Sequence, residues 1–561
     1  MSGFRQRRAV GLAILAVLGA AAVPGGSGCG RQNESRQERR RQEQAARQAS
    51  SLAGMREQLL AGAVSILSEL DRYEPDRAAE QVFDRLNQWG HAAPAAELPP
   101  VLKPPAAAFF ESLPDPLQDA CRPILERPLF DAREDVAAIR DRCWLAAVAR
   151  TVTGDAVDDL AVAERLFAWT VRSLAPVSDP PMVPTDAVPG SRWFLPGEIL
   201  LSGRGSGPQR AWIFVELLRQ VGIDAVMLAT PGPAGAAARP WVPAVLIGEE
   251  AYLFEPTYGL PVPGPDGTGV ATLRQAAADP AVLASLSLPG RPYPVAAADL
   301  AALEVLVVAD PWAIAPRMTR LDASLASEHG IRVAVAAADQ AARAAAVIAP
   351  GEEVPQGLWS FPWETVARRP LAGASLVGEL GPLETAIPDP RQGRSGRSFR
   401  PLFAGRVREF RGELDGPGGA KEAYLAARVS RRAMNLAVSG LPEPQALEIT
   451  NRLVRMKEDA TYWLGLVMIA EGANEAAVDY LGRMILENAP DSRWVDAARI
   501  NLATAMLGLG RRDEAVTLLR EDRSPQRFGS RLEAARIEAE RPAAERPEEP
   551  SAAVAPEGSP G

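Results

Sequence analysis

Apolar residues recur at helical spacing along most of the chain. Between residues 54 and 89 they return every three or four positions, which is the period of one face of an α-helix and predicts two helices. The same period returns between 110 and 148 and from Asp158 to Leu174. From Lys421 to about Leu532 it continues with short interruptions. The pattern therefore predicts a mainly α protein.

The middle of the chain departs from this period, because short apolar runs with strand character follow one another. We expect a short extended run, one helix and three strands, at Glu198–Leu201, Pro208–Val221, Ile223–Thr230, Trp241–Ile247 and Ala251–Phe254. The turn at 248–250 predicts that the last two strands are antiparallel. These elements predict an α+β core within the helical protein.

Three later stretches have a weaker pattern. Residues 271–356 mix Ala-rich helices with a β-like run at Leu303–Val308. Residues 357–419 show little periodicity, and their aromatic cluster predicts either a surface docking loop or a minor core; it consists of Trp359, Phe361, Pro362 and Trp363. The end of the chain, 533–561, is rich in Pro, Ala and Glu and predicts a disordered tail.

The beginning of the chain has the pattern of an export signal. Three arginines precede Ala9–Val23, a run of fifteen apolar residues, which suits a signal peptide and is short for a membrane span. The small residues before Cys29 resemble the lipobox of bacterial lipoproteins, although Gly26 stands where an aliphatic residue is usual. The resemblance implies that 1–28 is a signal peptide, that Cys29 is lipidated, and that the protein is anchored at the periplasmic face of the cell envelope.

The highly charged segment that follows, 29–53, contains few large apolar residues. It cannot bury enough surface to form a core. We expect a solvated tether or frayed helix, with contact between its basic residues and lipid headgroups as the alternative.

Composition excludes several classes of function. The chain has 561 residues, enough for three or four domains. Its 61 Lys and Arg against 70 Asp and Glu give a net charge of −9, which argues against nucleic acid as a partner. Three cysteines and two histidines, without metal-ligand spacing, argue against a zinc enzyme. We expect no metal and no cofactor. Cys121 and Cys143 are predicted either to form a disulfide or to remain buried thiols.

The segment Gly205–Ala229, with the sequence GSGPQRAWIFVELLRQVGIDAVMLA, resembles the transglutaminase-like domain of bacteria. The match rests on Ala211, Leu217, Leu218, Arg219, Gly222, Ile223 and Ala225. Downstream, Trp241 and Pro256-Thr257 match the second half of that domain. The resemblance covers about Asp158 to Gly259.

The resemblance implies a site that has lost its catalytic groups. Gly207 stands at the position of the family's cysteine, Arg239 at that of the histidine and Glu255 at that of the acid. Ser206 is a candidate substitute nucleophile, but a serine needs a base within hydrogen-bond reach and neither histidine lies in this segment. We expect Gly207, Arg239 and Glu255 to converge, with Arg239 paired to Glu255.

Gly207 has no side chain, so the start of the predicted helix should have room for a carboxylate from a bound partner. A dinucleotide-binding fold is a competing interpretation of the glycine-rich turn. It fails because Gly203, Gly205 and Gly207 are spaced G-x-G-x-G rather than G-x-G-x-x-G.

Near the C-terminus the chain repeats itself after 38 residues. This shift superposes the small residues Gly465 and Ala477 on Ala503 and Ala515. Small residues twelve apart resemble tetratricopeptide repeats, where they let paired helices approach closely. Only two copies are recognisable, so residues from Lys421 to Glu458 are predicted to cap the array. Plain helical-hairpin packing is the alternative.

Together these patterns predict a mainly α protein with an α+β transglutaminase-like core and a C-terminal array of α-helical repeat hairpins. The expected parts are a helical domain, the degenerate core, an α/β extension, repeats and tail, at 54–157, 158–270, 271–419, 420–532 and 533–561. We expect a non-catalytic envelope lipoprotein that binds a protein or peptide. The expected binding residues are Ser206, Arg219, Trp241, Gly465, Ala477, Ala503 and Ala515. The alternative is an active hydrolase or acyltransferase of the same fold that uses non-standard residues.

Overall fold

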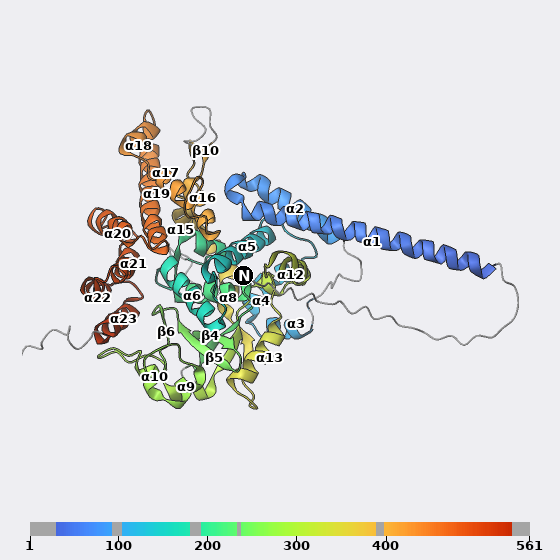
Figure 1. Cartoon of the computed structure of the whole chain (residues 1–561), viewed down its shortest axis with the longest axis horizontal. Coiled ribbons are helices and arrows are strands. Elements are labelled where there is room, and N and C mark those ends of the chain that lie inside the picture. Colours follow the sequence, from blue (N-terminus) through green and yellow to red (C-terminus); the bar gives the residue numbers. More distant parts are fainter. Residues whose placement is uncertain are drawn as a thin grey trace, which may run out of the picture. The chain divides into compact units, whose positions relative to one another are not determined.

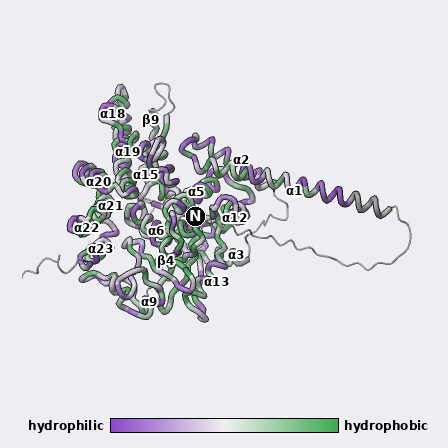
Figure 2. Tube along the Cα trace, viewed as in Figure 1, coloured by the Kyte–Doolittle hydropathy of each residue, from purple (hydrophilic) through white to green (hydrophobic). Residues whose placement is uncertain are grey.

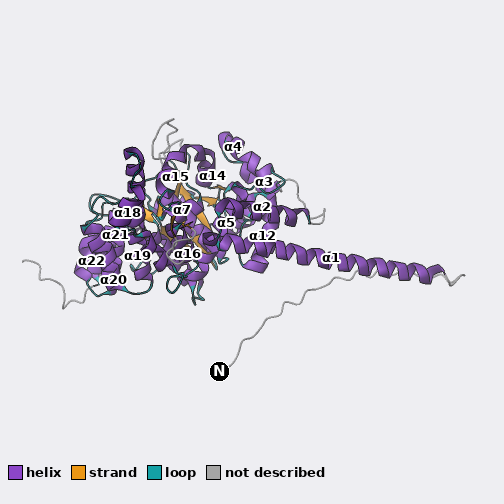
Figure 3. Cartoon of the chain, turned by 90° about the horizontal axis from the view of Figure 1, so that it is seen from above, coloured by secondary structure: helices purple, strands orange, loops and turns teal. Residues whose placement is uncertain are grey.

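This computed structural model describes residues 30–92, 102, 104–179, 192–232, 237–388 and 398–540. Helices make up most of these residues, and most of the strands belong to one six-stranded sheet (Figure 1, Figure 3). The prediction of a mainly α protein is therefore confirmed. The predicted signal peptide, Cys29 and residues 541–561 lie outside the described residues.

The chain divides into two units between Glu57 and Gln58. The described part of the first unit is the beginning of α1 (Gly30–Ser68), which is hydrophilic along much of its length (Figure 2). All side chains from 38 to 53 are exposed, because this stretch has few apolar residues to bury. No helix among the described residues is both long and apolar enough to span a membrane.

The second unit begins with a helical layer. It contains the end of α1, η1 (Leu70–Arg72), α2 (Pro75–His91), α3 (Pro104–Glu111), α4 (Asp115–Glu126), α5 (Glu134–Thr153) and α6 (Asp159–Ser173). Side-chain hydrogen bonds cap the N-termini of two of these helices. At the start of α2, Glu74 accepts the backbone N–H of Arg77, and at the start of α6, Asp158 accepts that of Ala161. Trp89 and Trp144 are fully buried between these helices.

The extended run expected at Glu198–Leu201 is instead a helix, α7 (Pro196–Ser202). Pro196 suits the first helical turn, and Glu198 accepts the backbone N–H of Leu195 at 2.9 Å. Gly203 ends the helix with a φ of 62°, a conformation that glycine adopts without strain. Three apolar residues in a row, Ile199, Leu200 and Leu201, are compatible with a buried helix as well as with a strand, and the caps determine that a helix forms.

The helix and three strands predicted next are confirmed as α8 (Gly207–Gln220), β3 (Asp224–Thr230), β4 (Arg239–Ile247) and β5 (Glu250–Glu255). With β6 (Leu260–Pro261), β7 (Glu304–Val307) and β8 (Gln356–Leu358) they form a six-stranded sheet of order β6-β5-β4-β3-β7-β8. Only the pair β7–β8 is parallel. A separate short parallel pair joins β1 (Ala175–Pro176) to β2 (Arg204–Gly205).

Both faces of this sheet are buried. Ala225 and Met227 of β3 face the core that contains α5–α8, whereas Val226 and Leu228 between them face a second core. This alternation follows from the two-residue period of a strand. The second core is closed by α9 (Leu273–Ala278), α10 (Pro280–Ala284), η3 (Ala297–Ala302) and part of α13 (Ala337–Ile348).

The remaining middle segment is more helical than its weak periodicity indicated. It contains α11 (Pro311–Ile314), α12 (Pro316–His329), α14 (Ser360–Arg368), η4 (Arg369–Ala372), α15 (Gly373–Leu380) and α16 (Pro401–Phe410), with the short strands β9 (Ile387–Pro388) and β10 (Ser398–Phe399). Trp359, Phe361 and Trp363 are buried. The aromatic cluster is thus part of the core rather than a docking loop.

The C-terminal region is helical, as expected. It comprises α17 (Ala420–Ala427), α18 (Arg431–Val438), α19 (Glu443–Ala470), α20 (Asn474–Val478), the π-helical η6 (Asp479–Glu487), α21 (Val495–Gly508), α22 (Arg512–Arg520) and α23 (Arg527–Ala539). Because α23 continues to Ala539, the tail predicted from 533 is helical over its first residues. One continuous apolar core runs from Leu60 to Ile537, so no gap separates the parts predicted as domains.

The two hairpins of the predicted repeat have the same turn bonding, 38 residues apart. The N–H of Ala473 bonds to the carbonyl of Met468, and the N–H of Arg511 to that of Met506, each at 2.9 Å. Gly472 and Gly510 precede these donors and both have a φ of 73°. The internal repeat in sequence is therefore also a repeat in backbone geometry.

Candidate functional site

The start of α8 is the position that the resemblance assigns to a nucleophile. Ser206 is the N-cap residue and is buried, and its N–H donates to Oε1 of Gln209 at 3.1 Å. Burial raises the pKa of Asp179, whose carboxyl lies near the backbone N–H of Gly207 and the hydroxyl of Ser206, and these two groups oppose the rise. A helix N-terminus favours a negative charge. We expected a bound partner to supply that charge; the nearby carboxyl of Asp179, an exposed residue, can supply it instead.

Gly207 does not leave open space. A β-carbon added there would lie 2.5 Å from Oγ1 of Thr257 and 3.4 Å from its Cβ, closer than side chains normally approach. Thr257 follows Glu255 and donates its backbone N–H to that carboxylate at 2.9 Å. The structure therefore brings Gly207 and the turn after Glu255 together, but Thr257 fills the place of the cysteine side chain.

Glu255 is buried at the end of β5. Its Oε2 accepts the hydroxyl of Tyr293 at 2.5 Å, and the indole N–H of Trp241 donates to the same tyrosine oxygen at 2.8 Å. Burial raises the pKa of Glu255, while the hydroxyl of Tyr293 and the backbone N–H of Thr257 oppose the rise. The acid position is thus held by neutral hydrogen-bond donors.

Arg239 lies apart from this chain of hydrogen bonds. It is the first residue of β4, is exposed, and stands opposite Thr230 across the sheet. The ion pair expected between Arg239 and Glu255 is not formed, because Tyr293 occupies the position next to the carboxylate. Burying a neutral tyrosine hydroxyl costs less desolvation free energy than burying a charged guanidinium. Arg239, at the exposed end of β4, stays in water.

Ser206 has no imidazole beside it. His91 lies in α2 with Nδ1 2.6 Å from the carbonyl oxygen of Asn87. His329 ends α12 next to Glu328. The group that faces Ser206 is the carboxyl of Asp179, and the serine is 0% exposed. A substrate would have to displace packed side chains to reach its hydroxyl.

Arg210 ties three elements together beside this site. Its buried guanidinium donates to the carbonyls of Leu174 at 2.9 Å and Pro256 at 3.3 Å, and to Oε1 of Gln526 at 2.6 Å. Burial lowers the pKa of Arg210 to about 10. The arginine therefore joins the end of α6, the turn after β5 and the segment before α23.

That C-terminal segment packs directly over the turn after Glu255. A β-carbon at Gly259 would lie 2.7 Å from the side-chain amide of Gln526, and one at Gly529 would meet the backbone of Tyr258. The ring of Phe528 lies 6.3 Å from that of Tyr258. Close backbone approach through these two glycines closes the site from the side of the helical hairpins.

The expected binding residue Arg219 belongs to a buried ion-pair network at the other end of α8. It pairs with Glu216 at 2.5 Å and also donates to the carbonyl of Val308. Glu216 lies 3.3 Å from Arg142, which pairs with Asp310 at 2.6 Å. These contacts hold α5, α8 and the residues before α11 together, so Nη1 and Nη2 of Arg219 are used within the fold.

The small residues expected to bind through the repeats lie between helices. Ala477, Ala503 and Ala515 are buried, and a β-carbon at Gly465 would lie 2.5 Å from Cδ2 of Leu481. These positions set the spacing between paired helices. Ala503 also lines a cavity of about 400 Å³ between α6, β6 and helices α21–α23.

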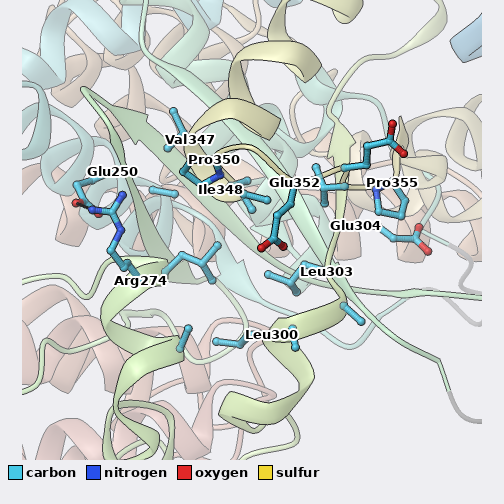
Figure 4. Close-up of a pocket in the computed structure, with 18 residues that line it drawn as sticks. Glu250, Arg274, Leu300, Leu303, Glu304, Val347, Ile348, Pro350, Glu352 and Pro355 are labelled. Atoms are coloured by element: carbon cyan, nitrogen blue, oxygen red, sulfur yellow. Dashed lines mark hydrogen bonds and ion pairs between the residues drawn. The ribbon is translucent and has the colours of Figure 1, made fainter.

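A second cavity, of about 510 Å³, lies between β5, η3 and the segment after α13. Figure 4 shows Arg274 beside Glu250 at one end and Glu304 at the other, with Leu300 and Leu303 between them. Arg274 and Glu250 form an ion pair at 2.9 Å. The remaining carboxylates give this cavity an acidic wall over an apolar floor.

Among the described residues, no group of three or more histidine, cysteine, aspartate or glutamate side chains could hold a metal ion. Comparison of the chain with family models, curated proteins and solved structures found no match. The resemblances to the transglutaminase-like domain and to tetratricopeptide repeats therefore rest on the sequence residues alone.

Sequence reasoning missed the residues that close the site. Tyr293 lies beyond the segment covered by the resemblance, and Asp179 and Gln526 come from segments with no motif. The sequence does not single out Arg210, because the same helix also contains the charged residues Glu216 and Arg219. Its partners lie in three distant segments, and no spacing in the sequence indicates them.

Proposed function

We propose that this chain is a lipid-anchored binding protein of the cell envelope. Its transglutaminase-like core has lost catalysis and serves, together with the helical repeats, as a scaffold for a protein or peptide partner. The observation that carries this proposal is the occupied site: Thr257 fills the volume at Gly207, and the carboxyl of Asp179 lies near the helix N-terminus.

A binding role is supported by apolar side chains exposed on α18 and α19. Leu436 is 77% exposed, and Leu447 is 60% exposed. Val454 lies seven positions after Leu447 and is also exposed, so both project from one side of α19. Exposed apolar groups gathered in one region are typical of surfaces that bind a partner.

One experiment tests whether the site is inactive. The full chain, reconstituted in lipid nanodiscs, is assayed for amidase, protease and cross-linking activity on peptide substrates, with Ser206→Ala as the matched variant. We expect no turnover by either protein. Hydrolysis that is lost on Ser206→Ala would instead establish the alternative, a hydrolase in which Asp179 activates Ser206.

A second experiment tests partner binding. Photo-cross-linking from α19 in cells should capture a partner protein, and Leu447→Asp should reduce its yield at least several-fold. Val157 is 95% exposed in another part of the chain, so Val157→Asp is the matched control and should leave the yield unchanged. Equal yields from both variants would place the partner elsewhere.

The lipid anchor is tested at Cys29. A fatty-acid analogue should label the wild-type chain and not Cys29→Ser, and the variant should leave the membrane fraction. Unchanged labelling and fractionation of Cys29→Ser would contradict the lipoprotein proposal.

A further inference from the structure

The cavity between α6, β6 and helices α21–α23 has walls of two kinds. Phe167, Phe254, Leu260 and Leu507 supply apolar surface, and Arg172 supplies a cation. The volume of about 400 Å³ falls within the range of small-molecule sites. A mostly apolar cavity with a few polar groups is the usual form of such a site.

Arg172 is unusual among the partly or fully buried arginines of this chain. Arg142 and Arg317 pair with carboxylates, and Arg210 donates to carbonyls and Gln526. In the described part of the chain, by contrast, no hydrogen bond or ion pair engages the guanidinium of Arg172. Burial lowers the pKa of Arg172, which reflects the unfavourable environment of a cation without an acceptor.

The position of Arg172 is nevertheless fixed. Its backbone carbonyl accepts Nδ2 of Asn501 at 3.3 Å, and the preceding carbonyl, of Val171, accepts Nη2 of Arg210 at 3.2 Å. The charge that acts on Arg172 is that of Glu409, which is already engaged by Arg406 and Tyr424. Arg172 thus lines the cavity with its backbone fixed, and its guanidinium has no acceptor of its own among the described residues.

The other charges at the cavity favour a ligand with a single negative charge. Glu533 and Arg536 pair with each other, at 2.7 Å. Glu164 is exposed to water and lies eight residues before Arg172 on α6, or about 12 Å along the helix axis. A monoanion compensates one guanidinium, whereas a dianion would add an uncompensated charge near Glu164.

We propose that this cavity binds a small amphipathic monocarboxylate. Its carboxylate accepts two hydrogen bonds from the guanidinium of Arg172, for which the planar fork is suited. Its apolar body lies against Phe167, Phe254 and Leu260. This ligand site goes beyond the proposed function, because it uses neither the closed site at Gly207 nor the exposed apolar residues of α18 and α19.

The test compares three probes that share an apolar body and differ in the head group: 4-phenylbutyrate, 4-phenylbutan-1-ol and 4-phenylbutylamine. Binding to the full chain in lipid nanodiscs is measured by calorimetry, with empty nanodiscs subtracted. We expect the carboxylate to bind at least about ten-fold more tightly than the alcohol, and the amine not to bind.

Variants assign this preference to the arginine. Arg172→Gln should weaken the carboxylate to the level of the alcohol and leave the alcohol unchanged, and Arg172→Lys should restore part of the preference. Arg536→Gln is the matched control, because this arginine also lines the cavity but is paired with Glu533; it should change the affinity by less than about three-fold.

Ala168→Trp provides a test of the cavity itself. Ala168 lines the cavity from the exposed side of α6, so a large side chain there should fill the space without disturbing the core and abolish binding of the carboxylate and the alcohol. The proposal would be overturned by equal affinities for all three probes, by an Arg172→Gln variant whose affinity for the carboxylate is unchanged, or by the absence of binding at millimolar concentration. Partner cross-linking at α19 is measured separately, so failure of one proposal is distinguishable from failure of the other.

Discussion

At the scale of single residues, the absence of a side chain at Gly207 has the opposite structural consequence from the one expected. A glycine at the cysteine position was expected to leave room for a ligand, but Thr257 occupies that room. The glycine permits a close approach between the start of α8 and the turn after β5, and any larger residue must move one of them. Gly207 is thus a packing residue.

The first prediction concerns this contact. Gly207→Ala should lower the free energy of unfolding by about 1–3 kcal/mol, because the added methyl group overpacks against Thr257. Gly373→Ala is the control, since a β-carbon there meets no atom within 4 Å and the residue begins a helix; it should be neutral or slightly stabilising. Urea unfolding of both variants gives the comparison, and equal midpoints would show that the site can relax around a side chain.

The second prediction concerns the buried acid. Burial raises the pKa of Glu255 above the ordinary 4.5. Between pH 4.5 and the pKa of Glu255 in the folded state, the folded protein therefore binds this proton more readily than the unfolded chain does. The contribution of the protonated Glu255 to the free energy of unfolding is fully present below pH 4.5 and is lost as pH rises through the folded-state pKa.

Glu255→Gln removes this titration and keeps an acceptor for Tyr293. The stability of the variant relative to the wild type should therefore increase as pH is raised from about 4. Unfolding curves at several pH values test the sign. A relative stability that falls with pH would mean that the hydrogen bonds from Tyr293 and Thr257 outweigh desolvation.

At the scale of elements, the 38-residue repeat is a repeat of helix spacing. In the first hairpin α19 approaches η6 closely because Gly465 has no side chain to hold them apart, and the buried Ala503 and Ala515 occupy the equivalent places in the second. The turn glycines adopt the left-handed conformation that lets the chain reverse. Sequence self-similarity thus located both the contacts and the turns.

The third prediction follows from this spacing. Gly465→Leu and Ala515→Leu should each destabilise the chain by about 1–3 kcal/mol, because a large side chain forces the paired helices apart. Glu475→Leu, at an exposed position of α20, should have an effect below about 0.5 kcal/mol. Thermal or urea unfolding measures all three variants. Similar midpoints for the buried and exposed positions would contradict close helix packing.

At the scale of the whole molecule, one core unites segments that the sequence pattern separates. The pair Arg142–Asp310 joins residues 168 positions apart, and Arg210 joins α8 to Gln526 across 316 positions. Breaking a buried ion pair leaves an uncompensated charge, so these contacts hold the predicted parts in one unit. The same core encloses Cys121 and Cys143, which are free thiols rather than a disulfide.

The fourth prediction uses these thiols. Burial raises the pKa of both Cys121 and Cys143 to about 12, so neither should react with a maleimide in the folded protein at pH 8. After denaturation the mass should increase by two maleimide adducts if Cys29 is lipidated and by three if it is free, since the chain has three cysteines. Rapid labelling of the native protein would contradict the buried positions.

The sequence by itself determined the features that depend on neighbours along the chain. Apolar periodicity gave α6, α8 and strands β3–β5, and the repeat gave the hairpins of α19–α22, because each of these elements buries a face set by local spacing. It also placed Gly207 and the turn after Glu255 in one site. The identity of α7 was missed because its buried apolar run has no helical period, and its caps decided the conformation.

Only the tertiary structure decided what surrounds each side chain. Tyr293 rather than Arg239 bonds to Glu255, Thr257 fills the space at Gly207, and Gln526 closes over the turn, although all of them are distant in sequence from the groups they contact. These choices depend on desolvation: a buried carboxylate accepts whichever donor the folded chain places beside it, and a guanidinium stays in water when the strand end allows it. Spacing along one sequence does not contain that information.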